Sequence, residues 1–281
     1  MHVLRSPGEL SAWTETARRQ GRRVGLVPTM GFLHRGHLSL MEASRARTDV
    51  TAVSIFVNPT QFGPSEDLAR YPRDLEGDLQ KCREAKVDAV FAPDAGAMYP
   101  PGHRTFVEVT ELQDGLCGAR RPGHFRGVAT VVTQLFALAR PHLGVFGEKD
   151  WQQLQIIRRL ALDLHLGVEV VGMPIVREPD GLALSSRNAY LSAPERARAL
   201  ALSRGLQSAQ RRWGSGERRA DALREAVRAE LRAAEVREDY VELVEPDTLR
   251  PLERADRPDA RLLVAGFVGS TRLIDNAAIA C

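Results

Sequence analysis

Residues 22–40 read RRVGLVPTMGFLHRGHLSL, and this stretch decides the fold. The apolar run over 22–29 predicts a short buried strand, and the apolar spacing over 37–48 predicts a helix. The loop between them contains two histidines, His34 and His37. A buried strand that leads through a short loop into a helix is the start of a βαβ unit. The stretch therefore predicts a parallel sheet with polar side chains at the end of one of its strands.

The same alternation of strand and helix continues to about residue 175. Nearly continuous apolar runs, which suit a sheet covered on both faces, predict further strands at 49–58, 87–93, 141–147 and 167–175. Helical spacing predicts helices between them at 73–86, 127–140 and 150–164. We therefore predict a Rossmann-like, doubly wound α/β domain over residues 1–175.

The pattern changes after this point, and a smaller α+β domain is predicted over residues 176–281. Two long helices are expected at 192–213 and 217–235, separated by the glycine-rich break GSG. Strands are then expected at 239–245, 261–269 and 271–276.

The composition is ordinary for a globular protein, with 43% hydrophobic and 27% charged residues, a net charge of +3 and a pI near 9.0. Of 39 basic residues only Lys81, Lys86 and Lys149 are lysines, and most arginines lie beside acids on predicted helices. Solvated helix faces therefore explain the charge better than a nucleic-acid-binding groove. A lysine in such a chain can mark a place where a compact, flexible ammonium is needed, as in GEKD.

The termini and the cysteines narrow the class of protein. The N-terminus MHVLRSPGEL has a Pro-Gly pair, predicted to form a turn, and no apolar signal core, and no run of eighteen apolar residues occurs. We therefore expect a cytoplasmic protein with no membrane partner. Cys82, Cys117 and Cys281 are far apart, so they predict isolated thiols rather than disulfides or a zinc cage.

Three polar loops follow predicted strands, and in open α/β sheets ligands bind beyond the carboxyl ends of the strands. The loops are MGFLHRGH at 30–37, NPTQFG at 58–63 and GEKD at 147–150. The chain has neither GxxxxGK[ST] nor GxGxxG, so another loop would have to hold any bound phosphate. The spacing of His34 and His37 alone leaves three interpretations open: a plain polar turn, a phosphate site at a helix N-terminus, or part of a zinc site.

The stretch PDGLALSSRNAYLS favours the phosphate interpretation. Ser185, Ser186 and Arg187 can all donate to phosphate oxygens, and arginine can do so through two parallel bonds. A loop of such donors near the domain boundary is what a closing nucleotide site needs.

Two resemblances refine this prediction. HRGH resembles the HxGH signature of the nucleotidyltransferase superfamily, and LSSRN is similar to its mobile phosphate loop. The finer resemblance is to the pantoate–β-alanine ligase family and covers essentially the whole chain. It rests on six motifs in order: PTMGFLHRGHLSL, SIFVNPTQFG, DLARYPRD, RPGHFRGVATVV, FGEKDWQQL and DGLALSSRN.

The family resemblance implies site residues at matching positions. It implies ATP-binding residues at Met30, Gly31, Phe32, Leu33, His34, Arg35, Gly36, His37, Gly147, Glu148, Lys149, Asp150, Val176, Leu184, Ser185, Ser186 and Arg187. The catalytic residues among them are His34, His37, Lys149 and Arg187. Gln61 and Gln153 resemble the pair that holds pantoate, and Gln61 is also expected to contact β-alanine. The loop LSSR lacks the leading lysine of the wider superfamily, which leaves Lys149 and Arg187 as the expected cationic pair.

The resemblance also implies ATP as co-substrate, Mg²⁺ with Asp78 as a candidate contact, and a homodimer that does not bind nucleic acid. Thr60 and Cys117 depart from the methionine and glutamate expected in many relatives, at positions that carry no catalytic role. The implied reaction is ATP-dependent condensation of pantoate with β-alanine to pantothenate through pantoyl adenylate, with release of pyrophosphate and AMP. The alternatives are transfer of AMP to a phosphate, nucleic-acid binding and a zinc hydrolase.

Overall fold

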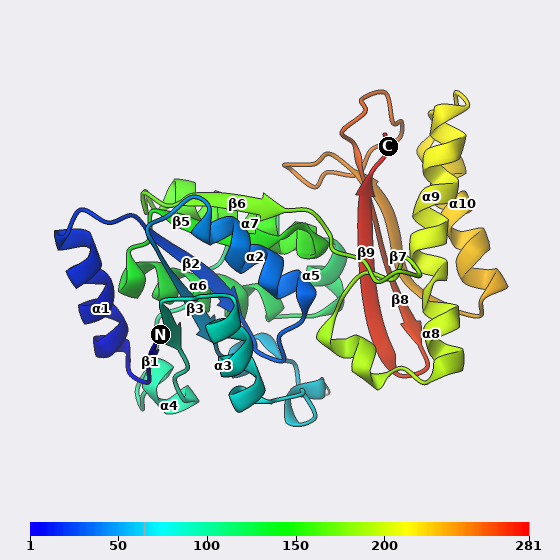
Figure 1. Ribbon diagram of the computed structural model, residues 1–281. Coiled ribbons are helices and arrows are strands. Elements are labelled where there is room, and N and C mark those ends of the chain that lie inside the picture. Colours follow the sequence, from blue (N-terminus) through cyan, green and yellow to red (C-terminus); the bar gives the residue numbers. More distant parts are fainter. Residues whose placement is uncertain (65, 281) are drawn as a thin grey trace. The chain divides into compact units, whose positions relative to one another are not determined.

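The structure is a computed structural model that describes residues 1–64 and 66–280, and the chain divides into two compact units (Figure 1). The first unit consists of Met1–Glu148 and Gln153–Pro174. The second unit consists of Lys149–Gln152 and Ile175–Cys281. The main division therefore falls one residue before the predicted boundary. Lys149–Gln152, which the prediction placed in the first domain, belong to the second unit.

In the described residues, the first unit contains a parallel six-stranded sheet in the order β1-β4-β3-β2-β5-β6. Its strands are β1 (His2–Leu4), β2 (Val24–Thr29), β3 (Val50–Ile55), β4 (Ala89–Phe91), β5 (Leu143–Gly147) and β6 (Glu169–Met173). The chain proceeds outward from β2 to β3 and β4, and then returns to β5 on the other side of β2. The predicted doubly wound fold is confirmed, and its strand order reverses between β2 and β5.

Helices cover both faces of this sheet (Figure 1). The helices described between β1 and β6 are α1 (Pro7–Arg19), α2 (Arg35–Arg45), α3 (Leu75–Glu84), α4 (Ala95–Met98), α5 (Leu116–Arg120), α6 (His124–Ala139) and α7 (Trp151–Asp163). Val27 and Val53 pack in the cluster that contains residues of α2 and α3. Val24 and Val50, three residues earlier on the same strands, pack with Ala17 of α1 instead. Strand side chains alternate between faces, which is why these runs are apolar throughout.

The predicted Pro-Gly turn at the N-terminus is wrong, because this pair begins helix α1. Ser6 caps the helix by accepting a hydrogen bond from the Glu9 amide, and the Glu9 side chain accepts one from the Ser6 amide in return. Pro7 occupies the first turn, where the missing N–H costs nothing.

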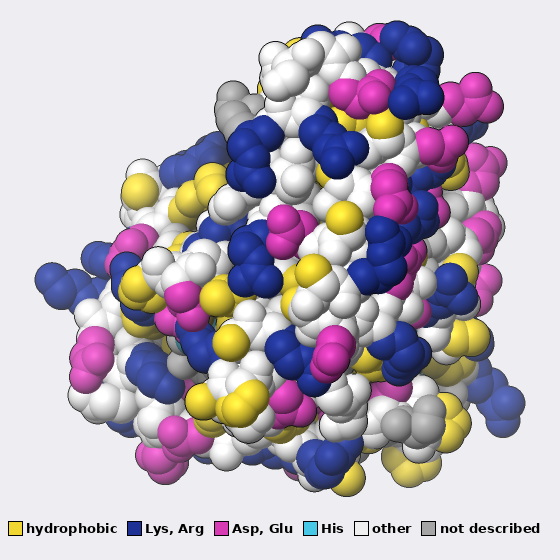
Figure 2. All heavy atoms as spheres, turned by 90° about the vertical axis from the view of Figure 1, so that its right-hand side faces the viewer, with side chains coloured by type: hydrophobic (Ala, Val, Ile, Leu, Met, Phe, Trp, Pro, Cys, Tyr) yellow, Lys and Arg dark blue, Asp and Glu magenta, His cyan; other side chains and the backbone are white. Residues whose placement is uncertain are grey.

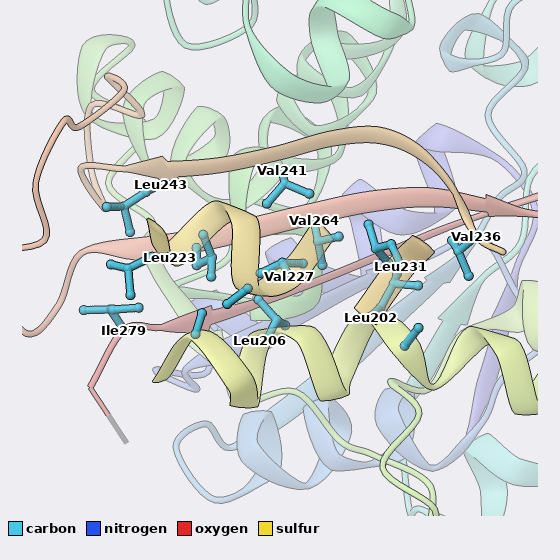
Figure 3. Packing of buried hydrophobic residues seen from close by; sticks show 14 of the residues in the cluster. Leu202, Leu206, Leu223, Val227, Leu231, Val236, Val241, Leu243, Val264 and Ile279 are labelled. Carbon is cyan, nitrogen blue, oxygen red and sulfur yellow. The ribbon is translucent and has the colours of Figure 1, made fainter. Parts of the chain in front are cut away.

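The second unit has an antiparallel sheet ordered β7-β8-β9 and covered by helices (Figure 3). The strands are β7 (Arg237–Val244), β8 (Arg261–Val268) and β9 (Thr271–Ala278). The helices are α8 (Ala193–Ala199), α9 (Ala201–Gly214) and α10 (Ala220–Ala233). Leu206 of α9, Leu223 and Val227 of α10 and Val264 of β8 share one buried cluster. The single helix predicted over 192–213 is divided at Leu200 into α8 and α9.

The face of the second unit in Figure 2 carries arginines interspersed with acidic side chains. Arg204 pairs with Glu230 across α9 and α10, and Arg228 of α10 pairs with Glu238 of β7. These arginines of α9 and α10 are therefore paired with acidic side chains.

Cys82 and Cys117 are buried, and burial raises the pKa of the Cys82 thiol to about 12. Cys281 lies outside the described residues.

Within the part of the chain that the structure describes, no helix has the length and hydropathy needed to cross a membrane.

Two leucines of α7 provide a test of which face of this helix is buried in the core. Leu160 is 1% exposed and Leu162 is 63% exposed. We expect Leu160→Ala to lower the free energy of unfolding by about 2–5 kcal/mol, because it leaves a cavity in the core. Leu162→Ala should change it by less than about 0.5 kcal/mol. Urea unfolding of both variants tests this, and equal effects would contradict the assigned helix face.

Candidate active site

The three predicted loops follow neighbouring strands of the first unit, at the same edge of its sheet. MGFLHRGH follows β2, NPTQFG follows β3 and GEKD follows β5. Because β2 lies between β3 and β5, all three loops start beside the point where the strand order reverses. This is the place where open α/β sheets bind ligands.

The carboxylate of Asp78 holds the first loop in place. Its two oxygens accept hydrogen bonds from the Phe32 and Leu33 amides, each at 2.7 Å. Gly31 and Phe32 have φ of +81° and +50°, and this left-handed turn brings successive amides to one carboxylate. Asp78 is 1% exposed, and burial raises the pKa of its carboxyl although the two amides oppose the rise. These contacts favour a positioning role for Asp78 over the predicted magnesium contact.

The two histidines lie at the start of α2 with their rings close together. His34 is the N-cap residue, and its Nδ1 accepts a hydrogen bond from the Gly36 amide at 3.2 Å. The Nδ1 of His37 accepts one from the His34 amide at 3.3 Å. The ring centroids are 4.0 Å apart. A neutral imidazole has one protonated nitrogen, so each neutral ring carries its proton on Nε2.

Gln61 is buried in the turn η1 (Pro59–Gln61), and its amide orientation follows from a network around Asn58. The Oδ1 of Asn58 accepts hydrogen bonds from the Tyr99 and Thr60 hydroxyls at 2.8 and 2.9 Å. Its Nδ2 therefore donates to the Gln61 Oε1, at 3.0 Å. The Nε2 of Gln61 then faces the Met30 sulfur at 3.2 Å. The predicted pantoate glutamine thus touches the predicted ATP loop. The network also shows what the unexpected Thr60 does: its hydroxyl helps to orient Asn58.

A second group of residues supports Gln61 from its backbone side, and sequence reasoning assigned them no role. His124 Nδ1 lies 2.8 Å from the Gln61 carbonyl oxygen, so this nitrogen carries the proton. His124 Nε2 can then accept from Arg121, at 2.9 Å, and Arg121 forms two 2.7 Å bonds with Glu66. Burial opposes ionisation of Glu66, but the bonds from Arg121 lower the pKa of this carboxyl overall.

Gly127 explains why α6 can approach η1 so closely. A Cβ at this position would lie 2.4 Å from the Thr60 carbonyl oxygen and 2.6 Å from the Gln61 nitrogen. The motif RPGHFRGVATVV contained the signal for these contacts with η1, because it spaces Arg121, His124 and Gly127 three residues apart.

The remaining predicted residues of the first unit lie around the end of β5. Gly147 is the last residue of β5 and is paired with Met173 of β6. Glu148 begins the short turn η3 (Glu148–Asp150). Gln153 is half-buried in the first turn of α7. Gln61 and Gln153 therefore follow strands on either side of β2, with no direct contact between them among the described hydrogen bonds.

The second unit carries the other residues that were predicted to bind phosphate. The Val176 carbonyl accepts a hydrogen bond from the Leu184 amide at 3.0 Å, which closes the loop between them. Ser185 caps the turn η4 (Ser186–Tyr190) by accepting from the Arg187 amide at 3.3 Å. Lys149 is half-buried and Asp150 is exposed. The predicted ATP residues are thus divided between the two units.

Comparison with known proteins identifies closely similar sequences. The chain matches the family model described as pantoate-beta-alanine ligase over residues 2–278. It is 64% identical over 277 residues to the pantothenate synthetase of Myxococcus xanthus, covering 98% of this chain and 94% of that protein. It is 59% identical over 281 residues to the pantothenate synthetase of Anaeromyxobacter dehalogenans, covering 98% and 97%.

Solved structures agree with the sequence comparison. The chain resembles the pantothenate synthetase from Thermus thermophilus with a TM-score of 0.94 and 48% identity over the whole of both chains. It also resembles the pantoate-beta-alanine ligase from Francisella tularensis, which was solved in complex with beta-gamma ATP and beta-alanine. That likeness has a TM-score of 0.85 and 31% identity, and covers 99% of this chain and 98% of that one.

The role of Asp78 in holding the loop can be tested by hydrogen exchange. We expect Asp78→Asn to speed amide exchange at Phe32 and Leu33 by at least about tenfold, because one accepting oxygen is replaced by an NH₂ group and hydrogen bonds to charged groups contribute about 1.5–3 kcal/mol. Glu76→Gln makes the same chemical change at an exposed position of α3 and serves as the control. Unchanged protection in Asp78→Asn would contradict the role of this carboxylate.

Proposed function

The chain belongs to the pantoate–β-alanine ligase family, and we propose that its strand-end loops use ATP to join pantoate to β-alanine, giving pantothenate. Activation is needed because a carboxylate is a poor acylating agent, since its leaving group would be oxide. In the first step, a pantoate carboxylate oxygen attacks the α-phosphorus of ATP and the bond to the β-phosphate oxygen breaks. The products are pantoyl adenylate and pyrophosphate. In the second step, the unprotonated β-alanine amine attacks the acyl carbon, the bond from this carbon to the phosphate oxygen of AMP breaks, and the nitrogen loses a proton as AMP departs.

The observation that supports our assignment of roles is that the Nδ1 atoms of both histidines accept hydrogen bonds from backbone amides. Because backbone amides occupy both Nδ1 atoms, the neutral rings of His34 and His37 present Nε2–H donors. We assign these donors to the α-phosphate and the departing pyrophosphate. They act beside the N-terminus of α2, where backbone N–H groups and the helix dipole also favour anions. Neither step needs a nucleophilic side chain, so the enzyme acts by positioning and by stabilising charge.

The other predicted residues divide by charge. We assign the cations Lys149 and Arg187, with the hydroxyls of Ser185 and Ser186, to the phosphate chain of ATP. We assign the neutral amides of Gln61 and Gln153 to pantoate, and Gln61 also to β-alanine. Neutral donors hold a carboxylate without the strong attraction of a cation, so the carboxylate keeps its nucleophilicity. We assign a main-chain contact on the adenine side to Val176, whose carbonyl accepts a hydrogen bond from the Leu184 amide.

We propose that Mg²⁺ arrives bound to the phosphates of ATP. Among the described residues, no group of three or more His, Cys, Asp or Glu side chains is arranged to hold a metal ion. Both oxygens of Asp78 also accept backbone amides. Mg²⁺ commonly binds through substrate phosphates and water with few protein ligands. When bound, the ion would offset phosphate charge. A homodimer and a cytoplasmic location remain predictions, the first from the family resemblance and the second from the sequence.

An isotope-exchange assay between ATP and pyrophosphate tests the first step. We expect pantoate-dependent exchange that does not require β-alanine. Transfer of AMP to a phosphate acceptor instead of a carboxylate would give exchange that does not depend on pantoate.

His37→Ala and Lys149→Ala should each lower the exchange rate by at least about 10², the effect of losing one donor to a transition state. Lys86→Ala, which removes an exposed lysine, is the control and should leave the rate unchanged. Near-normal exchange in His37→Ala or Lys149→Ala would refute the role of that residue.

Gln61→Ala should raise the KM for pantoate about tenfold or more and change the KM for ATP much less. The reason is that the amide is assigned to the carboxylate substrate and not to the nucleotide. Gln80→Ala, at an exposed position of α3, is the matched glutamine control. Steady-state kinetics with each substrate varied in turn would decide the matter. A larger effect on ATP than on pantoate would count against the assignment.

A further inference from the structure

Two successive residues of β9, Asp275 and Asn276, are buried polar side chains in the second unit. They are 3% and 2% exposed. Burial of polar groups is costly unless they form hydrogen bonds, so these two need partners. Successive side chains of a strand point to opposite faces of the sheet, so each of the two meets a different segment of chain.

Asp275 holds the segment that leads into the phosphate loop. Its carboxylate pairs with both terminal nitrogens of Arg177, at 2.6 and 2.9 Å. The same guanidinium donates to the Gly181 carbonyl at 3.1 Å, across the loop that Arg177 and Ala183 close as bridge partners. This loop runs from Val176 to Leu184 and continues directly into Ser185–Arg187.

Asn276 holds the segment that carries the other cation. Its Nδ2 donates to the main-chain carbonyl of Lys149 at 2.9 Å, and its Oδ1 accepts from Arg261 Nε at 2.8 Å. The Arg261 guanidinium lies 3.6 Å from the ring centroid of Trp151, and the Trp151 Nε1 donates to the Pro246 carbonyl at 2.8 Å. Arg261, Asn276 and Trp151 thereby fix Lys149–Gln152 to the second unit.

The two residues are also bonded to each other, because the backbone N–H of Asn276 donates to Asp275 Oδ1 at 2.8 Å. One short stretch of β9 is therefore connected to both phosphate-binding segments of this unit. The side chain of Lys149 is long and flexible, and fixing the backbone that carries it restricts the positions its ammonium can take. Small errors of placement are costly in catalysis, since a displacement of about 1 Å can cost about 10² in rate.

We propose that Asp275 and Asn276 together act as positioning residues that fix Lys149 and the Ser185–Arg187 donors relative to one another for binding the phosphates of ATP. This inference rests on the proposed function of those donors. It assigns no direct contact with the substrate to either residue of β9.

The test uses the full-length enzyme in the pyrophosphate-exchange assay, with ATP and pantoate varied separately. Asn276→Ala removes the bond to Lys149. Arg177→Lys keeps the positive charge but loses the bidentate pairing with the Asp275 carboxylate. Each variant should raise the KM for ATP about tenfold, the effect of losing one hydrogen bond of about 1.4 kcal/mol. The KM for pantoate should change less than twofold.

Arg272→Ala is the matched control. Arg272 also lies on β9 and pairs with Asp239 at 2.7 Å, but Asp239 belongs to β7, a strand that carries none of the predicted ATP residues. We expect the thermal midpoint Tm to fall in all three variants, because each loses a contact of the second unit. Both KM values of the control should stay within twofold of the wild type.

The outcomes separate this inference from the proposed function. Absence of pantoate-dependent exchange in the wild-type enzyme would refute the proposed function itself. With an active wild type, a selective rise in the KM for ATP in both test variants supports the positioning role. A fall in Tm with unchanged KM values, equal changes for both substrates, or a selective effect in only one variant would overturn it. A titration of ATP binding by calorimetry should show the same tenfold weakening.

Discussion

The bond between the Asp78 carboxylate and two successive amides of the first loop is the constraint on which the site depends. Gly31 and Phe32 adopt left-handed backbone, a conformation that needs compensation in a residue other than glycine. Asp78 supplies that compensation from α3 by accepting hydrogen bonds at Phe32 and Leu33. The turn fixed in this way sets where α2 begins. It therefore sets the place of His34 as N-cap and of His37 one turn later.

In the proposed site, cationic and neutral side chains are assigned to different substrates. The cations are assigned to the phosphates, which carry several negative charges and leave as pyrophosphate. The glutamines are assigned to the carboxylate that must attack. Gln61 illustrates how such a neutral donor is held: Asn58 fixes its oxygen, and His124 fixes its backbone carbonyl. His124 reaches it from α6, a helix that lies far along the chain from the turn that carries Gln61.

Five of the six strands of the parallel sheet were predicted from the sequence, because their signals are local; the short strand β1 (His2–Leu4) was not predicted. Continuous apolar runs such as 49–58 and the loops after them need only strand geometry and the covered faces of a parallel sheet. Two local predictions were wrong, one at the N-terminus and one in the helix predicted over 192–213. Pro7 and Gly8 suggest a turn, but Ser6 and Glu9 form a capping box that makes the pair a helix start. Leu200 sits in an unbroken helical pattern, yet α8 ends at Ala199 and α9 begins at Ala201.

The contacts that hold the site residues in place could not be predicted from such local rules. The bonds of Asp78 to Phe32 and of Asn276 to Lys149 join residues 46 and 127 positions apart. No periodicity or motif spacing encodes such pairings. The motif match gave the position of Lys149 but not its membership of the second unit. That membership depends on contacts made by Trp151, Arg261 and Asn276.

The most direct test of this account is the protonation state of the two histidines. Long-range ¹H–¹⁵N correlation NMR of the nucleotide-free enzyme, at a pH where the rings are neutral, reports which nitrogen carries the proton. The account predicts that His34 and His37 are both protonated on Nε2, because backbone amides donate to both Nδ1 atoms. Protonation on Nδ1 in either ring would contradict the claim that the pair presents Nε2–H donors to the phosphates.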